Sequence, residues 1–146
     1  MTTTTLRAGT AHPVVDQLLR RARLELDAAD STEDPAMRFL HAHMAAIRSA
    51  SAVLALRALG SRRRGRPRSV WEQLADAGEE WERWAARFEV AAQLRAAIDA
   101  GRIGELDGAV ADDAVWAADE FVADVAAAAR TAGHGHRAAD STPLAS

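Results

Sequence analysis

The sequence predicts an all-α, up-and-down bundle of about five helices, and three observations support this fold class. Alanine, the strongest helix former, dominates the composition together with Leu, Val and Arg. No segment of credible length alternates apolar and polar residues with the period of two that a half-buried strand shows. Gly and Pro are few, and most of them stand between segments in which apolar residues recur every three or four positions. A chain of 146 residues suits one domain with its own core.

The first two helices are expected at about residues 14–29 and from Pro35 to about Leu59. Pro13 stands where a helix favours proline, and Asp30–Asp34 supplies N-cap residues before Pro35. Gly60 is suited to end the second helix. Its predicted apolar stripe is Met37, Leu40, Met44, Ile47, Leu54 and Ala58, flanked by the small residues Ala42, Ala46 and Ala50. Because it is apolar over much of its circumference, we expect it to be the central helix.

Three further helices are expected in the second half. Ser69-Val70-Trp71-Glu72 matches a capping box and starts a short helix. Gly78 separates it from a longer helix at about 79–100, which Gly101 ends. The last helix is expected at about 109–131. Their predicted buried residues are Trp71, Leu74, Trp81, Trp84, Phe88, Val110, Ala114, Ala118, Phe121, Val122 and Val125. All four tryptophans are assigned to the core.

We therefore divide the chain into a flexible N-terminus (1–12), a helical domain (13–132) and a disordered C-terminal tail (133–146). Cys is absent, which excludes disulfides and Cys-ligated zinc. The start MTTTTLRAGT has no apolar leader, and no run of 18 apolar residues follows. These features predict a cytoplasmic protein without a membrane segment.

Charge is divided unevenly along the chain. Residues 1–68 carry 12 Arg and 6 acidic residues, whereas residues 69–132 carry 5 Arg and 14 acidic residues. This division has two interpretations: ion pairing between helices or subunits, or a basic face that binds nucleic acid. Five arginines concentrate the positive charge before the third helix, and they are candidates for binding an RNA or DNA backbone: Arg62, Arg63, Arg64, Arg66 and Arg68. The alternative is a solvated loop.

Arg38, His41 and His43 are the candidate catalytic residues, at the start of the second helix. At about 100° per residue, Arg38 and His41 share a face, whereas His43 lies about 140° from Arg38 and about 160° from His41. The two histidines therefore do not share a metal, and we expect neither a metal nor a cofactor. Arg48 falls close to His41 on the same face.

Structural roles compete with catalysis at these positions. His43 borders the apolar stripe, where a half-buried histidine would form a hydrogen bond to a neighbouring helix. Arg38 lies near the N-terminal end of its helix, where the dipole favours an anion. It is equally suited to pair with Glu33 or Asp34.

The chain resembles small actinobacterial HEPN-domain proteins in two parts of its sequence. These are the segment from Arg38 to Arg48 with its Ala-rich continuation to Gly60, and the segment from Trp71 to Gly101. The likeness covers residues 14–131. It implies an all-α bundle that is commonly a homodimer. Many HEPN domains are metal-independent endoribonucleases with an Arg–x(4–6)–His motif, which Arg38 and His43 match. Others are non-catalytic binders of nucleotide, nucleic acid or protein.

Two features depart from the catalytic pattern that this resemblance implies. Phe39 stands where active members usually have a polar residue, and the motif opens the second helix rather than a later one. We therefore expect a non-catalytic accessory or regulatory module that binds nucleic acid or a protein partner. The alternatives are a toxin-type endoribonuclease and a purely structural adaptor. In the ribonuclease, His43 would transfer a proton, Arg38 would stabilise phosphate charge, and His41 would be a reserve, in a site assembled across a dimer.

Overall fold

The computed structural model describes residues 12–57 and 68–140, and within them the chain forms five helices and no strand. The helices are α1 (Pro13–Ser31), α2 (Pro35–Leu56), α3 (Val70–Asp76), α4 (Glu79–Asp99) and α5 (Gly108–Asp140). The predicted all-α class is confirmed. The expectations for the flexible N-terminus, for Gly60 and for most of the arginine-rich segment lie outside the described residues.

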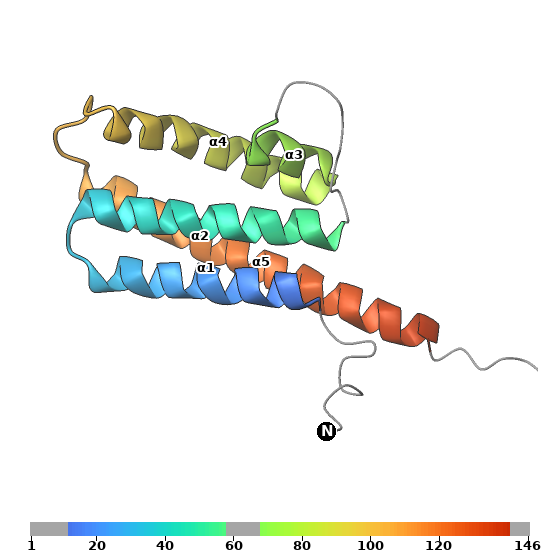
Figure 1. Cartoon of the computed structure of the whole chain (residues 1–146). Coiled ribbons are helices and arrows are strands. Elements are labelled where there is room, and N and C mark those ends of the chain that lie inside the picture. The colour runs from blue at the N-terminus through green and yellow to red at the C-terminus, as the bar shows by residue number, and fades with distance from the viewer. Residues whose placement is uncertain (1–11, 58–67, 141–146) are drawn as a thin grey trace, which may run out of the picture.

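The four long helices run alternately in opposite directions (Figure 1). α2 lies between α1 and α4, while α5 passes behind α1 and α2 and extends beyond them. The short α3 packs on α4 and on α2. Because α2 also contacts α1, α4 and α5, it is the central helix, as its apolar circumference predicts.

α2 is the one helix in the described part of the chain that is long and apolar enough to cross a membrane. Half of the qualifying window is buried inside the bundle, and Phe39, Ala46 and Val53 are at most 2% exposed. The core helix of a soluble domain has these properties, so its hydropathy is explained by packing against the other helices.

Local sequence signals start two of the helices as predicted. At α2, the Asp34 carboxylate accepts a hydrogen bond from the Ala36 backbone N–H at 3.3 Å, and Pro35 occupies the first turn. At α3, the Ser69 hydroxyl accepts from the Glu72 N–H at 3.1 Å. Each cap satisfies a backbone donor that the helix itself leaves unpaired.

Gly101 ends α4 in a Schellman motif. The Arg102 N–H donates to the Ala97 carbonyl at 2.9 Å, and the Gly101 N–H donates to the Ile98 carbonyl at 3.0 Å. This pattern requires a left-handed residue after the helix, and Gly101 has a φ of 70°. Glycine adopts that conformation without the steric penalty of a side chain.

Aromatic rings from α3, α4 and α5 form the centre of the main core. The Phe88 ring lies 5.0 Å from Phe121 and 5.1 Å from Trp71 between centroids, and Trp84 stacks on it at 5.7 Å. Trp81 packs edge-on against Phe121 at 6.0 Å. The predicted apolar face of α3 and α4 is therefore confirmed, with Trp84 only half-buried.

The predicted apolar stripe of α2 is wrong by part of a turn. Met37 is 42% exposed, and the larger residues after it in the stripe are only partly buried. The most buried face instead carries Phe39, Val53 and the small residues that were assigned to the flank, Ala42, Ala46 and Ala50. These alanines allow α1 and α5 to approach closely, so small side chains occupy the most enclosed positions.

Three expectations for the last helix also need correction. Val110 is 40% exposed, and Trp116 is 57% exposed with the Arg87 guanidinium 5.7 Å above its ring. The cation–π contact explains how this tryptophan is accommodated at the surface. α5 does not end near residue 131 but continues to Asp140, into the segment expected to be disordered. The helical preference of the alanines outweighs the glycines there.

Candidate functional site

Arg38 projects from the first turns of α2 towards α5, where its guanidinium forms an ion pair with the Asp112 carboxylate. Its side chain is only 25% exposed, whereas that of Asp112 is 63% exposed. The expected partners Glu33 and Asp34 are therefore replaced by a residue on another helix. The positive charge of Arg38 is therefore already compensated by an exposed carboxylate of α5.

His43 lies inside the bundle, 4% exposed. Its ring is stacked 6.0 Å from Phe39 and lies 5.7 Å from Trp71 of α3, measured between centroids. The Nδ1 atom is buried without a hydrogen-bond partner among the described residues, so the expected bond to a neighbouring helix is not seen there. Burial, followed by the positive charge of Arg95, lowers the pKa of His43 to about 4. The imidazole is therefore neutral at physiological pH.

The structure does not bring Arg38 and His43 together. Arg38 is directed to the acidic start of α5, and His43 faces the aromatic core. Both residues lie on the regular helix α2, on which their spacing separates them by about 140°. The two candidate groups therefore act on different sides of α2.

His41, the reserve candidate, belongs to a polar cluster between α1 and α2. Its Nδ1 lies 2.8 Å from Glu25 Oε2, and Arg48 Nη2 lies 3.8 Å from Glu25 Oε1. His41 and Arg48, which helical spacing places on one face of α2, thus contact the same carboxylate on α1. The cluster connects the two helices and leaves His41 with a structural partner.

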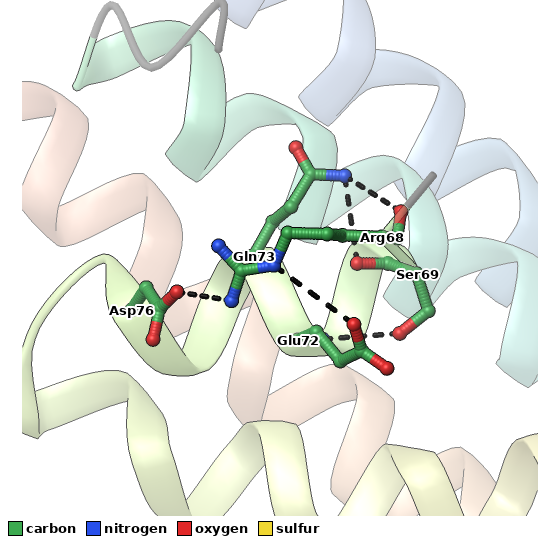
Figure 2. A network of polar contacts seen from close by, with 5 residues as sticks. All are labelled: Arg68, Ser69, Glu72, Gln73 and Asp76. Carbon is green, nitrogen blue, oxygen red and sulfur yellow. Dashed lines mark hydrogen bonds and ion pairs between the residues drawn. The ribbon is translucent and has the colours of Figure 1, made fainter. Parts of the chain in front are cut away.

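Of the five candidate nucleic-acid-binding arginines, only Arg68 lies within the described residues. Figure 2 shows that its guanidinium reaches Asp76, with Glu72 3.9 Å away. The Gln73 side-chain amide also donates to the Arg68 carbonyl at 3.1 Å. Two carboxylates of α3 therefore compensate Arg68. Arg62, Arg63, Arg64 and Arg66 lie outside the described residues.

Other ion pairs join the basic first half of the chain to the acidic second half. Arg23 lies 3.5 Å from Asp119, and Arg57 lies 2.5 Å from Glu80. Together with the Arg38–Asp112 pair, these contacts connect α1 and α2 to α4 and α5. Of the two interpretations of the charge division, internal complementarity between helices is the one observed in the described residues.

Sequence reasoning missed a cavity of about 350 Å³ between α2, α4 and α5. Its lining includes His43 and the aromatic rings of Phe39 and Phe88. Alanines of α4 and α5 leave the space open, and the Arg87–Asp113 ion pair, 2.6 Å long, adjoins it. Small residues on two helices were the available signal, but their contribution depends on a helix pairing that periodicity alone does not define.

The described residues contain no group of three or more His, Cys, Asp or Glu that could hold a metal ion. In a comparison with family models, the HEPN_SAV_6107-like HEPN model matches residues 29–126. The match covers most of α2 to α5 and includes Arg38 and His43. Searches of the curated proteins and of the solved structures find no match.

Proposed function

Because the chain belongs to the HEPN_SAV_6107-like HEPN family, we propose that it is a non-catalytic HEPN module that acts by binding a protein partner, as a homodimer. The separation of Arg38 from His43 carries this proposal. A ribonuclease needs a cation at the phosphate and a proton-transferring group at the reacting oxygen of the same nucleotide. Here the cation pairs with Asp112, and the imidazole is enclosed by Phe39 and Trp71.

A site shared between two subunits would meet the same obstacle. Arg38 would have to leave Asp112, and His43 would have to move from 4% exposure to contact with RNA. An imidazole whose pKa is lowered to about 4 is also a weak base and mostly unprotonated near neutral pH. These observations favour binding over cleavage.

A protein partner is favoured over nucleic acid because the described arginines near the basic segment already have carboxylate partners. Arg57 pairs with Glu80, and Arg68 pairs with Asp76. A phosphate backbone would have to displace these carboxylates, and that exchange reduces the gain from counterion release. Exposed apolar residues on α5, Trp116 and Val110, instead suit a protein interface.

Cleavage is tested with purified protein and single-stranded RNA in EDTA. We expect no cleavage by the wild type. Arg38→Ala and His43→Ala serve as paired controls, with His134→Ala as a histidine variant remote from the motif. EDTA-resistant cleavage that both Arg38→Ala and His43→Ala abolish, but His134→Ala retains, would establish the ribonuclease and refute the proposal.

Partner type is tested separately. Light scattering coupled to size exclusion should give the mass of a dimer, which Trp116→Glu should reduce and Val14→Glu, at an apolar α1 position 53% exposed, should not. RNA binding, followed by fluorescence anisotropy across salt concentrations, should be weak. Tight RNA binding would favour nucleic acid instead, provided that it depends on the arginine-rich segment. In that case the dependence of affinity on salt should flatten when Arg62, Arg63 and Arg64 are replaced together with Ala, but not when Arg20 and Arg21 are replaced.

A further inference from the structure

Trp116 lies on an outer face of α5, between two hollows of the molecular surface. The residue is 57% exposed, although the Arg87 guanidinium lies 5.7 Å from the centroid of its ring. One hollow, of about 330 Å³, extends to Leu26 of α1 and Arg38 of α2, and the other, of about 470 Å³, extends to Trp84 of α4. We call Trp116 and these two hollows the Trp116 surface. Because tryptophan is enriched in protein interfaces, this surface is a candidate for docking.

The Trp116 surface carries an excess of negative charge. Five carboxylates and three arginines line its hollows, and the carboxylates are those of Asp30, Asp112, Asp119, Glu120 and Asp124. Asp112 and Asp119 each pair with an arginine, yet their side chains remain 63% and 60% exposed. They can therefore accept further hydrogen bonds from a partner. Within the described ranges, no three of these carboxylates are grouped closely enough to hold a metal ion, so the complementary partner is an organic cation.

The sequence of α5 makes it unfavourable for two copies of this face to pair with each other. Residues 103–129 contain seven acidic residues and no basic residue. Two copies that met through α5 alone would place these like charges opposite one another, which is costly in an interface. The partner that suits the Trp116 surface is therefore a basic segment.

The chain itself contains such a segment. Residues 35–71 include eight arginines and no acidic residue, and four of these arginines fall within residues 62–66, the arginine-rich segment. A guanidinium group stacks on the face of a tryptophan ring and forms paired hydrogen bonds with a carboxylate. The Trp116 surface offers both kinds of contact, so the arginine-rich segment complements it in chemistry as well as in charge.

The position of this segment in the chain favours a contact between two copies. α2 and α5 run in the same direction and are aligned where Arg38 pairs with Asp112 (Figure 1). At 1.5 Å per residue, Leu56 at the end of α2 lies about 27 Å beyond Arg38. Trp116 lies only about 6 Å beyond Asp112, so the end of α2 is about 20 Å further along the bundle. Ten residues, 58–67, that leave and return to this end extend about 19 Å at most, too short to bring their backbone to Trp116 of the same chain.

We propose that the Trp116 surface binds the arginine-rich segment of a second copy of this chain. Each copy carries one surface and one segment at different levels of the bundle, so a two-fold axis across the bundle forms both contacts at once. Guanidinium groups of the segment contact the Trp116 ring and the carboxylates beside it. This inference rests on the homodimer of the proposed function and names the surfaces that join its subunits.

The first test reverses a charge of the Trp116 surface, with the dissociation constant of the dimer measured by sedimentation equilibrium. Because exposed charges are screened by salt, the wild-type constant should rise at least about tenfold between 50 mM and 500 mM NaCl. Glu120→Arg should raise it at least about tenfold at 50 mM NaCl, since it places a cation opposite the arginine-rich segment. Glu89→Arg, the same change at an exposed position of α4 that lines neither hollow, should leave it unchanged.

The second test reverses the charge of the segment. Arg62→Glu, Arg63→Glu and Arg64→Glu are combined in one chain, the segment variant, which should also raise the dissociation constant at least about tenfold. A control variant changes the net charge equally by replacing three exposed arginines elsewhere with Glu: Arg20, Arg21 and Arg102. This control should dimerise like the wild type, because a general increase in negative charge is not what weakens the dimer.

Mixing the two weakened variants shows whether the contacts join different chains. In a mixed dimer, the Glu120→Arg surface faces the acidic segment of the segment variant, and the unchanged surface faces the unchanged segment. Opposite charges are thus restored in both contacts. Sedimentation velocity with fluorescently labelled segment variant should show a mixed dimer with Glu120→Arg at concentrations where each variant alone is a monomer. Glu89→Arg, which has the same net charge as Glu120→Arg, should not recruit the labelled chain.

Three outcomes would overturn the inference. A dimer that both charge reversals leave intact would be formed through another surface, and the homodimer of the proposed function would stand. Failure of the weakened variants to form a mixed dimer would show that the segment does not bind the Trp116 surface of a second copy. A monomeric wild type would refute the homodimer together with this inference. The RNA cleavage assay is independent of all three, so the non-catalytic role is tested separately.

Discussion

His43 should make the stability of this protein fall steeply in mild acid. Burial and the Arg95 charge lower its pKa from 6.5 to about 4 in the folded state. In the unfolded chain, the imidazole regains its ordinary pKa and takes up a proton at higher pH. Between about pH 6.5 and pH 4 the unfolded state therefore binds more protons, and the free energy of unfolding decreases as the pH falls.

The size of this effect follows from the pKa difference. Lowering the pKa of His43 from 6.5 to about 4 corresponds to a loss of about 3 kcal/mol in the free energy of unfolding, once the pH is below the pKa of the folded state. Total stabilities of small domains are about 5–15 kcal/mol, so the loss is large enough to measure by urea unfolding. Carboxylates also titrate near pH 4, so the comparison must be made between variants.

His43→Phe supplies this comparison, because the phenyl ring retains the stacking position on Phe39 but does not titrate. Between pH 7 and pH 4, we expect the free energy of unfolding to fall less in His43→Phe than in the wild type. The difference between the two decreases should be about 3 kcal/mol. His134→Phe, at an exposed position of α5, should behave like the wild type. Parallel pH profiles for wild type and His43→Phe would show that His43 is not enclosed as described.

Three further perturbations test the packing and the helix ends by denaturant unfolding. Phe88→Ala should lower the free energy of unfolding by about 3–5 kcal/mol, because it removes a ring that three other rings contact. Val90 is 66% exposed, so Val90→Ala should change the free energy of unfolding by less than about 0.5 kcal/mol. Similar losses for the two variants would contradict the assigned face of α4. Arg38→Ala should cost no more than about 1 kcal/mol, since its ion-pair partner is largely exposed, and a larger loss would indicate a more enclosed pair. Gly101→Ala should cost about 1–2 kcal/mol through its left-handed backbone alone, because no atom would lie within 4 Å of the added Cβ; Gly104→Ala has the same open surroundings without positive φ and should not be destabilising.

The sequence was sufficient to predict the features that depend on neighbouring residues. Asp34 and Ser69 cap their helices through backbone groups two or three residues away, and Gly101 ends α4 through contacts within the same turn. The face of α4 that carries Trp81 and Phe88 was also predictable, because large aromatic residues recur there at helical spacing.

Features that depend on distant helices could not be predicted in this way. α2 is apolar on several sides, and its alanine-rich face is the most buried one because α1 and α5 pack against it. Residues far apart in sequence form the Arg38–Asp112 pair, and periodicity contains no information about such a partner. Trp116 has a large apolar side chain, which predicts burial, but its contact with Arg87 of α4 allows it to remain at the surface.

The Arg–x4–His spacing itself explains why a motif match does not define a catalytic site. Residues five positions apart on a regular helix point about 140° away from each other. Arg38 and His43 therefore reach one substrate only if the helix is distorted or if a second chain supplies one of them. α2 is continuous from Pro35 to Leu56, and each residue has surroundings of its own: Asp112 for the guanidinium, and Phe39 and Trp71 for the imidazole. The spacing that satisfies the motif thus also places His43 in the core, among the residues that line the cavity between α2, α4 and α5.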